Sequence, residues 1–462
     1  MKQMADTPDR NGFLEDLNEA VDHFIDRKFD KYIVISHNDA DGISCLHIFQ
    51  NLLYRMNLEY DYFIYNRSVS WSNYLEGILS KKQNNKIALI FTDVGSNLTE
   101  LIPIISNRQE YFFILDHHEV DVNPNSLKIP ENLKFVNPTI HGYDGLDHIA
   151  GATLTYMFAK KINPKPVVNQ GWLTIIGIAG DTLRPMDRLE SFNLEIYNEL
   201  LEENIFQDSE GLCIFGNMYE KIKNGLKNSI LPFIKGLGGE DDQTIKSFLK
   251  QLQINPNKKV IDLTDYEIEK IQEIAKFKSY GHYATFLNKQ GILKFAFEHA
   301  LLLNILCFKN INVALSVVQK KAITIYAKEV YQEYISDLVK NLKKIVNLPH
   351  YETEKAIFID AGEVIPASNW SDTASFTVVN DLLDPDKILF LGGEEKVNHN
   401  IKLSIRCSRK YLEQNKGIGV NSIIAKIKKD LGGMGGGHKL AGGLRLSVPS
   451  FKRLKENINN YI

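Results

Sequence analysis

Four short apolar runs near the start of the chain, each followed by Asp or His residues, constrain the fold most. They are rich in β-branched and aromatic residues and occupy positions 32–35, 87–91, 112–115 and 175–179. Apolar runs of this length are typical of strands buried on both faces of a parallel sheet, although the last could also be a turn of a buried helix. Ligands of open α/β sheets bind at the carboxyl ends of strands. We therefore expect the polar residues after the runs to meet at one edge.

The polar residues that follow these runs have the chemistry of ligands for divalent cations. They are His37, Asp39, Asp41, Asp93, Asp116, His117, His118 and Asp181. Carboxylates crowded within a few ångströms repel one another strongly, so their convergence predicts one divalent cation or a pair. Manganese and magnesium favour such ligands. A single Asp after a strand, such as Asp93 or Asp181 alone, is more commonly a helix cap or turn residue, so the hypothesis depends on all four positions together.

Length and composition indicate a soluble globular protein of two or three domains. The chain has 462 residues, of which 44% are hydrophobic and 24% charged. No apolar run approaches the length of a membrane span, and residues 1–10 lack the apolar core of a signal peptide. Four scattered cysteines without a Cys-x-x-Cys pair fit a reducing compartment and argue against a disulfide framework or structural zinc. We therefore expect a cytoplasmic protein with no membrane association.

The charge is distributed unevenly along the chain. The net charge is only −3, but residues 401–462 contain thirteen Lys or Arg against three acids, a surplus of +10 that leaves −13 for the rest. An acidic metal-binding part joined to a basic C-terminal part suits a polyanionic substrate. Alternatively, individual lysines only solvate a helix face. Within this part, the glycine-rich residues 432–438 predict a loop whose N–H groups can approach a phosphate closely, or else a merely flexible loop.

The pattern of apolar residues divides the chain into three parts. Strands and helices alternate to about residue 200, helical patterns dominate residues 205–345, and strands return from residue 355. Residues 320–345 predict one long amphipathic helix connecting two lobes. We therefore predict an α/β protein with domains at 1–204 (parallel sheet and catalytic residues), 205–350 (helical insertion and connector) and 351–462 (smaller α/β, substrate-binding).

Taken together, the motifs resemble those of the DHH phosphoesterase superfamily. His37-Asn38-Asp39-Ala40-Asp41-Gly42 resembles its first motif, Thr92-Asp93-Val94-Gly95 the second, Asp116-His117-His118 the third and Gly180-Asp181 the fourth. Gly435-Gly436-Gly437-His438, followed by Ala441-Gly442-Gly443, resembles the signature of the DHH-associated domain. Some relatives have three residues between the His and the first Asp. The single Asn38 here resembles the RecJ-like exonuclease branch.

The resemblance implies a two-metal site with assigned roles. Two divalent ions are expected, usually manganese, with magnesium possible: His37 and Asp39 would hold one, Asp41, His117 and Asp181 the other, and Asp93 would bridge them. As further catalytic residues, His118 would face the substrate phosphate and Asp116 would orient an imidazole. Arg406, which ends a strand, resembles an arginine that grips substrate phosphate, and Gly435, Gly436, Gly437 and His438 would contact substrate beside it.

The resemblance also implies a function and partners. The expected activity is that of a metal-dependent phosphodiesterase: a single-strand-specific exonuclease acting on DNA or RNA in DNA repair or replication and releasing mononucleotides. The segment 205–345 resembles that of archaeal RecJ-like proteins that associate with the GINS replication complex. Two alternatives remain, a phosphodiesterase for nanoRNA or dinucleotides, and a non-catalytic replication factor. The last class typically loses metal ligands, whereas this chain retains them.

Overall fold

The protein is described here by a computed structural model covering residues 7–65, 69–80, 86–123, 126, 128–145, 147–182, 186, 189–395, 399–415 and 417–462. The first six residues and Lys416, one of the thirteen C-terminal cations, lie outside this range. The chain forms two compact units: the first unit comprises residues 1–211 and 280–331, and the second unit residues 212–279 and 332–462. The three-domain division at 204 and 350 stays a prediction.

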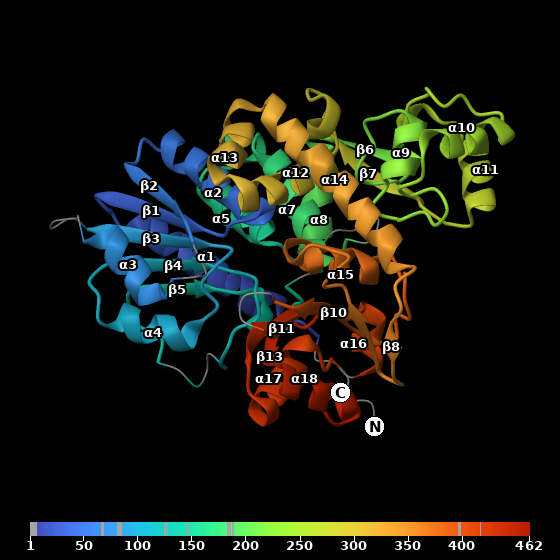
Figure 1. Ribbon diagram of the computed structural model, residues 1–462. Coiled ribbons are helices and arrows are strands. Elements are labelled where there is room, and N and C mark those ends of the chain that lie inside the picture. Colours follow the sequence, from blue (N-terminus) through green and yellow to red (C-terminus); the bar gives the residue numbers. More distant parts are fainter. Residues whose placement is uncertain are drawn as a thin grey trace. The chain divides into compact units, whose positions relative to one another are not determined.

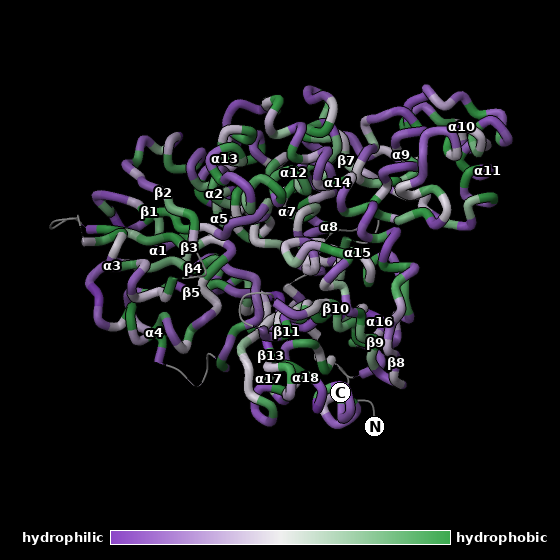
Figure 2. The backbone as a smooth tube through the Cα atoms, in the orientation of Figure 1, coloured by the Kyte–Doolittle hydropathy of each residue, from purple (hydrophilic) through white to green (hydrophobic). Residues whose placement is uncertain are grey.

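A parallel five-stranded sheet is the centre of the first unit, as the apolar runs predict (Figure 1). Its strand order is β2-β1-β3-β4-β5. The strands are β1 (Lys31–Ser36), β2 (Tyr60–Ile64), β3 (Ile87–Thr92), β4 (Tyr111–Leu115) and β5 (Leu133–Val136). The three central strands, β1, β3 and β4, are buried at nearly every position and are largely hydrophobic in Figure 2. These three are the strands that precede the first three groups of predicted ligands.

Helices cover both faces of this sheet. They are α1 (Arg10–Asp26), α2 (Ala40–Arg55), α3 (Trp71–Leu79), α4 (Leu98–Ser106), α5 (Gly151–Ile162), α6 (Pro164–Val168), α7 (Gly171–Thr182) and α8 (Ser191–Glu202). Ile33 and Ile35 share one core with residues of α3 and α4. On the other face, Phe24 of α1 contacts the rings of Tyr32 and Phe113. Because successive strand residues point to opposite faces, both faces need apolar residues, which explains the continuous apolar runs.

The fourth apolar run, residues 175–179, lies within helix α7 and not in a strand. Of the two interpretations that periodicity leaves open, the buried helix is the one observed. The helix is buried because α7 packs against α2 and α5. The predicted ligands therefore follow three strand ends and one helix end.

The middle of the chain is mostly helical, as predicted, but it also contains a small sheet. Its helices are α9 (Ile222–Asn228), α10 (Asp242–Gln251), α11 (Asp265–Ala275), α12 (Ala296–Lys309), α13 (Ile311–Lys320) and α14 (Ile325–Ile345). The long predicted helix is α14, which begins in the first unit and ends in the second. Strands β6 (Gln207–Leu212) and β7 (Tyr280–Thr285) form a two-stranded sheet. β6 was not predicted because its sequence, QDSEGL, is mostly polar.

A mixed six-stranded sheet forms the C-terminal part of the second unit, in the order β12-β13-β11-β10-β9-β8. Its strands are β8 (Tyr351–Glu352), β9 (Ala356–Asp360), β10 (Ile388–Glu394), β11 (Asn400–Arg406), β12 (Met434–Gly437) and β13 (Ala441–Ser447). Its helices are α15 (Trp370–Val379), α16 (Arg409–Gln414), α17 (Val420–Leu431) and α18 (Val448–Glu456). The predicted strands β9, β10 and β11 and the overall α/β class are confirmed. No helix in the described part of the chain has the length and apolar character needed to cross a bilayer.

The glycine-rich segment forms an edge strand, which corrects the prediction of a loop. Met434–Gly437 is β12 and pairs antiparallel with β13. A Cβ on Gly435 or Gly437 would come within 2.2 Å of a backbone oxygen of β13. These two glycines therefore permit close pairing of the strands, a use of glycine that composition alone does not distinguish from a loop. Gly436 faces open space.

Candidate metal centre

The turn from β1 into α2 brings the first two predicted ligands together. Asp39 is the residue before α2, and its side chain accepts a hydrogen bond from the N–H of Gly42 (2.9 Å). Nδ1 of His37 lies 2.5 Å from Oδ2 of Asp39 and 3.5 Å from Oδ2 of Asp93. A Cβ on Gly42 would come within 2.4 Å of the carbonyl oxygen of His37. This turn therefore closes only with glycine at that position, as the first motif has it.

Asp41 is held by the N-terminus of another helix. Its two carboxylate oxygens accept hydrogen bonds from the N–H groups of Gly151 (2.7 Å) and Ala152 (2.8 Å), the first residues of α5. The start of a helix carries unpaired N–H groups and partial positive charge, which favour a carboxylate there. Gly177 of α7 also approaches Asp41 closely, because a Cβ at this position would lie 2.4 Å from Oδ1 of Asp41. Two glycines thus allow two helices to approach one buried carboxylate.

Asp93 follows β3 in a left-handed backbone conformation, with φ of 59°. This conformation is uncommon outside glycine, although Asp and Asn tolerate it better than most residues. Its side chain is buried, with 1% of its surface exposed. Oδ1 lies 3.0 Å from Nε2 of His117, and Oδ2 makes no hydrogen bond to any described residue. The two oxygens of Asp93 are therefore directed to different neighbours.

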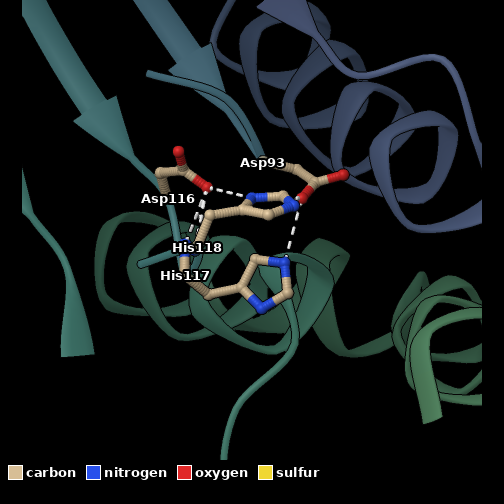
Figure 3. A group of neighbouring side chains, drawn as sticks. All are labelled: Asp93, Asp116, His117 and His118. Atoms are coloured by element: carbon tan, nitrogen blue, oxygen red, sulfur yellow. Dashed lines mark hydrogen bonds and ion pairs between the residues drawn. The ribbon is translucent and has the colours of Figure 1, made fainter. Parts of the chain in front are cut away.

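The Asp116-His117-His118 triplet follows β4 and is shown in Figure 3 with Asp93. Oδ1 of Asp116 accepts hydrogen bonds from Nδ1 of His118 (2.7 Å) and from the N–H of His117 (2.8 Å). Its Oδ2 accepts from the N–H and the hydroxyl of Ser96, at 2.8 and 2.6 Å. All of its strong acceptor sites are thus directed to protein groups. Asp116 accordingly orients His118, the kind of role expected from the family.

The ring of His117 is oriented like that of a metal-binding imidazole. Its Nδ1 lies 2.5 Å from the carbonyl oxygen of Gly145, which can only accept, so Nδ1 carries the proton. Nε2 then faces three carboxylates, at 3.0 Å from Asp93, 3.4 Å from Asp181 and 3.7 Å from Asp41. Metal-binding histidines commonly donate the second ring N–H to a backbone carbonyl in this way.

The carboxylates repel one another strongly enough to change their proton affinities. Burial and the charge of Asp181 raise the pKa of Asp41 well above its usual value. Burial, more than the opposing attraction of His117, raises the pKa of Asp181 to about 6. Burial would lower the pKa of His37, but the carboxylates of Asp39 and Asp93 outweigh it and raise that pKa to about 10. The site therefore attracts positive charge, in this case protons.

The donor set fits one or two divalent cations. Three overlapping groups have ligand atoms close enough to share an ion: His37, Asp39 and Asp93; Asp41, His117 and Asp181; and Asp93, Asp116, His117 and His118. Within the part of the chain that is described, Oδ2 of Asp93 and Oδ2 of Asp181 are buried without a hydrogen bond. Buried carboxylate oxygens without a partner are the atoms that a cation would stabilise. The structure thus brings all eight predicted residues together, while the role of each as a ligand stays a prediction.

Helix α12 supports the site, and nothing in the sequence predicted this. Oδ1 of Asn304 accepts a hydrogen bond from the N–H of Ala40 (2.7 Å), and Asn38 donates to the carbonyl of Cys307 (3.3 Å). Asn304 lies more than 260 residues after the first motif, in an apolar helix without a recognisable pattern. Only the folded structure identifies it as a neighbour of that motif.

Apart from His118, the predicted substrate-binding residues lie in the second unit. Arg406, at the end of β11, donates to the hydroxyls of Ser371 and Ser375, each at 2.8 Å, and to the carbonyl of Gly442 at 3.2 Å. Burial lowers the pKa of Arg406 to about 10. Together with Lys402, Arg445 and Gly435 it lines a depression of about 440 Å³. His438 follows β12, and its N–H donates to the carbonyl of Ala441 (2.7 Å). Arg406 is thus held firmly at the wall of a basic depression.

Two family models match the chain. The model described as DHH family, N-terminal domain, matches residues 31–179, and the model described as DHHA1 domain matches residues 358–462. The first range contains the predicted ligands from His37 to His118, and Asp181 lies two residues beyond it. The second range contains Arg406 and His438. The order of the two domains is the order of the motifs along the sequence.

The chain is also similar to one curated protein and to several solved structures. Uncharacterized protein MJ0831 of Methanocaldococcus jannaschii is 24% identical over 471 residues, covering 97% of each protein. CDC45 from Entamoeba histolytica has a TM-score of 0.65 at 11% identity, covering 96% of this chain and 98% of that one, so the two share a fold. A structure of exonuclease RecJ bound to manganese has a TM-score of 0.48 at 16% identity, covering 96% and 94%. With a DHH domain followed by a DHHA1 domain, the chain belongs to the DHH family.

Proposed function

We propose that the protein is a metal-dependent phosphodiesterase that removes mononucleotides from the ends of single-stranded nucleic acid. The observation that carries this proposal is the group of eight Asp and His residues at the ends of β1, β3, β4 and α7, with two buried carboxylate oxygens left without a hydrogen bond. Divalent ions bound there, manganese or magnesium, would lower the pKa of a bound water and stabilise the oxygens that attack and leave phosphorus.

The residues of the site divide this task among them. Asp93 directs one oxygen toward His117 and the other toward His37, which suits a carboxylate that joins two ion sites. Asp41 is fixed by two backbone N–H groups, so its position does not depend on an ion. His118 is oriented by Asp116 and is the residue we assign to the substrate phosphate.

A polyanionic strand is the substrate that the charge distribution favours. The surplus of +10 in residues 401–462 lies within the range matched by the DHHA1 model, far along the sequence from the acidic residues of the candidate metal centre. Some of these cations are engaged within the fold, for example Arg445 with Glu395 and Lys410 with Asp386. The cations Lys402, Arg406 and Arg445 line the basic depression, and their charge supports binding of phosphate there.

A second candidate is a non-catalytic replication factor that assembles with a GINS-type complex. The fold shared with CDC45 favours it, although that likeness at 11% identity concerns the fold alone. Retention of the complete ligand set supports an enzyme, because crowded buried carboxylates destabilise a protein that does not use them. A nanoRNA or dinucleotide phosphodiesterase would have the same centre and differ in substrate length.

The decisive experiment is a time course on end-labelled single-stranded DNA and RNA of several lengths, with manganese. We expect stepwise release of mononucleotides that stops on addition of a chelator and is absent with an Asp93→Asn variant. Cleavage restricted to the shortest strands would favour the small-substrate alternative. Absence of hydrolysis with either metal, together with retained binding to a replication complex, would favour the non-catalytic candidate.

A further inference from the structure

The first unit also contains a hollow, which is lined by none of the predicted metal ligands. It measures about 480 Å³ and is lined by the C-terminal half of α2, edge strand β2, the start of α7 and the end of α13. Its first residue on α2, His47, comes six residues after Asp41, roughly 9 Å further along the helix axis. The proposed hydrolysis does not use this hollow.

Two buried hydrogen-bond acceptors in the lining have no partner among the described residues. Nδ1 of His47 lies 2.9 Å from the carbonyl oxygen of Ile43, so it carries the ring proton, and Nε2 is left as an acceptor. Burial lowers the pKa of His47, which keeps the ring neutral. Oδ1 of Asn51, one helical turn further on, is also buried without a partner. Because buried polar groups without partners are costly, the pair indicates a ligand that donates hydrogen bonds.

The rest of the lining is aromatic, amide-bearing or cationic. Arg55 and Lys321 contribute positive charge, three tyrosines and Trp172 contribute rings, and the described lining contains no Asp or Glu. Tyr54 is 70% exposed, so its ring is available to a ligand. Amide side chains read the edges of nucleobases, rings stack on their faces, and cations bind phosphate.

A surplus of positive charge beside the hollow points independently to an anion. Nζ of Lys289 is buried without a hydrogen-bond partner in the described chain and lies 3.4 Å from the ring centre of Trp172. Nζ of Lys321 lies 5.7 Å from the same ring. Burial and the nearby charge of Lys321 lower the pKa of Lys289 to about 7. A phosphate bound by Lys321 would offset the repulsion between the two ammonium groups.

We propose that this hollow binds a nucleotide whose base carries an exocyclic amino group. The amino group donates to Nε2 of His47 and Oδ1 of Asn51, the base lies against Tyr54, and Arg55 and Lys321 hold the phosphate. The same chemistry is offered by a free mononucleotide and by one unit of a single strand. The site is separate from the metal centre, so the protein would hold nucleotides at two places.

The test compares pairs of nucleotides in which a carbonyl oxygen replaces the exocyclic amino group and the adjacent ring nitrogen gains a proton. Binding of CMP and UMP, and of AMP and IMP, is measured by calorimetry on the full chain with chelator present, so that no hydrolysis occurs. We expect CMP and AMP to bind at least about tenfold more tightly than UMP and IMP, since an unmet buried acceptor costs a ligand on the order of that factor. A parallel series with short oligo-C and oligo-U distinguishes a strand from a free nucleotide. Equal affinity within every pair, or no binding, would overturn the proposal.

Variants locate the binding and have matched controls. Asn51→Leu should reduce the preference for CMP and AMP, because only the acceptor of His47 remains. Tyr54→Ala should weaken the binding of all four nucleotides, whereas Tyr266→Ala, at another exposed tyrosine, should not. Lys321→Asn, at a position with φ of 51° that Asn tolerates, should weaken binding, whereas its neighbour Lys320→Ala should not. If Asn51→Leu unfolds, the exposed Tyr54 variant decides alone. The measurement requires no turnover, so failure of the proposed hydrolysis would not affect it.

Discussion

Replacing Asp93 separates the backbone requirement at this position from its chemistry. Asp93 combines a left-handed φ of 59° with a buried carboxylate between His37 and His117. Asp93→Ala removes the side chain and forces a residue with a Cβ but no polar group into that conformation. Asp93→Asn retains shape and tolerance of the backbone, and its amide can donate to Nε2 of His117. Only the charge is lost in the second variant.

The two variants should differ in stability but agree in activity. Ala tolerates the left-handed conformation less well than Asp or Asn, and the unpartnered His117 ring adds on the order of 1 kcal/mol. We expect Asp93→Ala to lower the free energy of unfolding of the metal-free protein by about 1–2 kcal/mol. Asp93→Asn should leave it nearly unchanged, because loss of one charge also relieves repulsion with Asp41 and Asp181. Both variants should lower the rate of hydrolysis by more than about a hundredfold. Removing a group that only orients a metal ligand costs activity up to about that factor, and a ligand itself should cost more.

Denaturant unfolding with and without manganese checks this prediction. At about one hundred times its dissociation constant, a ligand that binds only the folded state stabilises it by about 2.7 kcal/mol. Wild type should gain this stabilisation, and both Asp93 variants should gain clearly less. An Asn variant that keeps the full manganese effect and near-normal turnover would refute a bridging role for Asp93.

Four further outcomes are expected. Gly177→Ala should weaken manganese binding and lower the free energy of unfolding by about 1–3 kcal/mol, because the new Cβ meets Asp41. Gly77→Ala, which has open space around it, should change neither quantity, and metal titration and denaturant unfolding compare the two variants. Arg406→Lys should raise KM while calorimetric manganese affinity stays unchanged. Affinity for single strands should grow with length and fall with salt, with a log–log slope of roughly −0.7 per phosphate contact; a flat length dependence would contradict the strand substrate. The pKa of Lys289 is about 7 in the folded protein, below its ordinary value of 10.5, so the folded state binds fewer protons than the unfolded state between these pH values. The free energy of unfolding should therefore rise with pH across that window. Denaturant unfolding at several pH values should show this rise for the wild type and not for Lys289→Met.

Strands and the polar residues at their ends could be predicted because local pattern and tertiary role agree there. β1, β3 and β4 are buried on both faces, so apolar residues occupy nearly every position and the first polar side chain marks the strand end. Residues 175–179 show where local pattern no longer distinguishes a strand from a helix. A helix buried all round and a buried strand have the same continuous apolar composition, and only packing against α2 and α5 distinguishes them.

Other features were not predictable because they depend on partners distant in sequence. The mostly polar β6 (Gln207–Leu212) is a strand only through its pairing with β7 (Tyr280–Thr285). The contact of Asn304 with the first motif requires α12 to return to the sheet. Nothing in the sequence identifies the N–H of Gly151 as the donor that fixes Asp41.

How the fold tolerates so many buried carboxylates also indicates where cations would bind. Asp116 is stabilised by Ser96 and His118, and Asp41 by two N–H groups at the start of α5. These groups fix the position of both side chains, and for Asp116 they also compensate the negative charge. Oδ2 of Asp93 and Oδ2 of Asp181 have no such hydrogen bond within the described chain. Oδ2 of Asp93 lies 3.5 Å from Nδ1 of His37, and Oδ2 of Asp181 lies 3.4 Å from Nε2 of His117, so a cation bound beside either oxygen would complete the network that the folded chain leaves open.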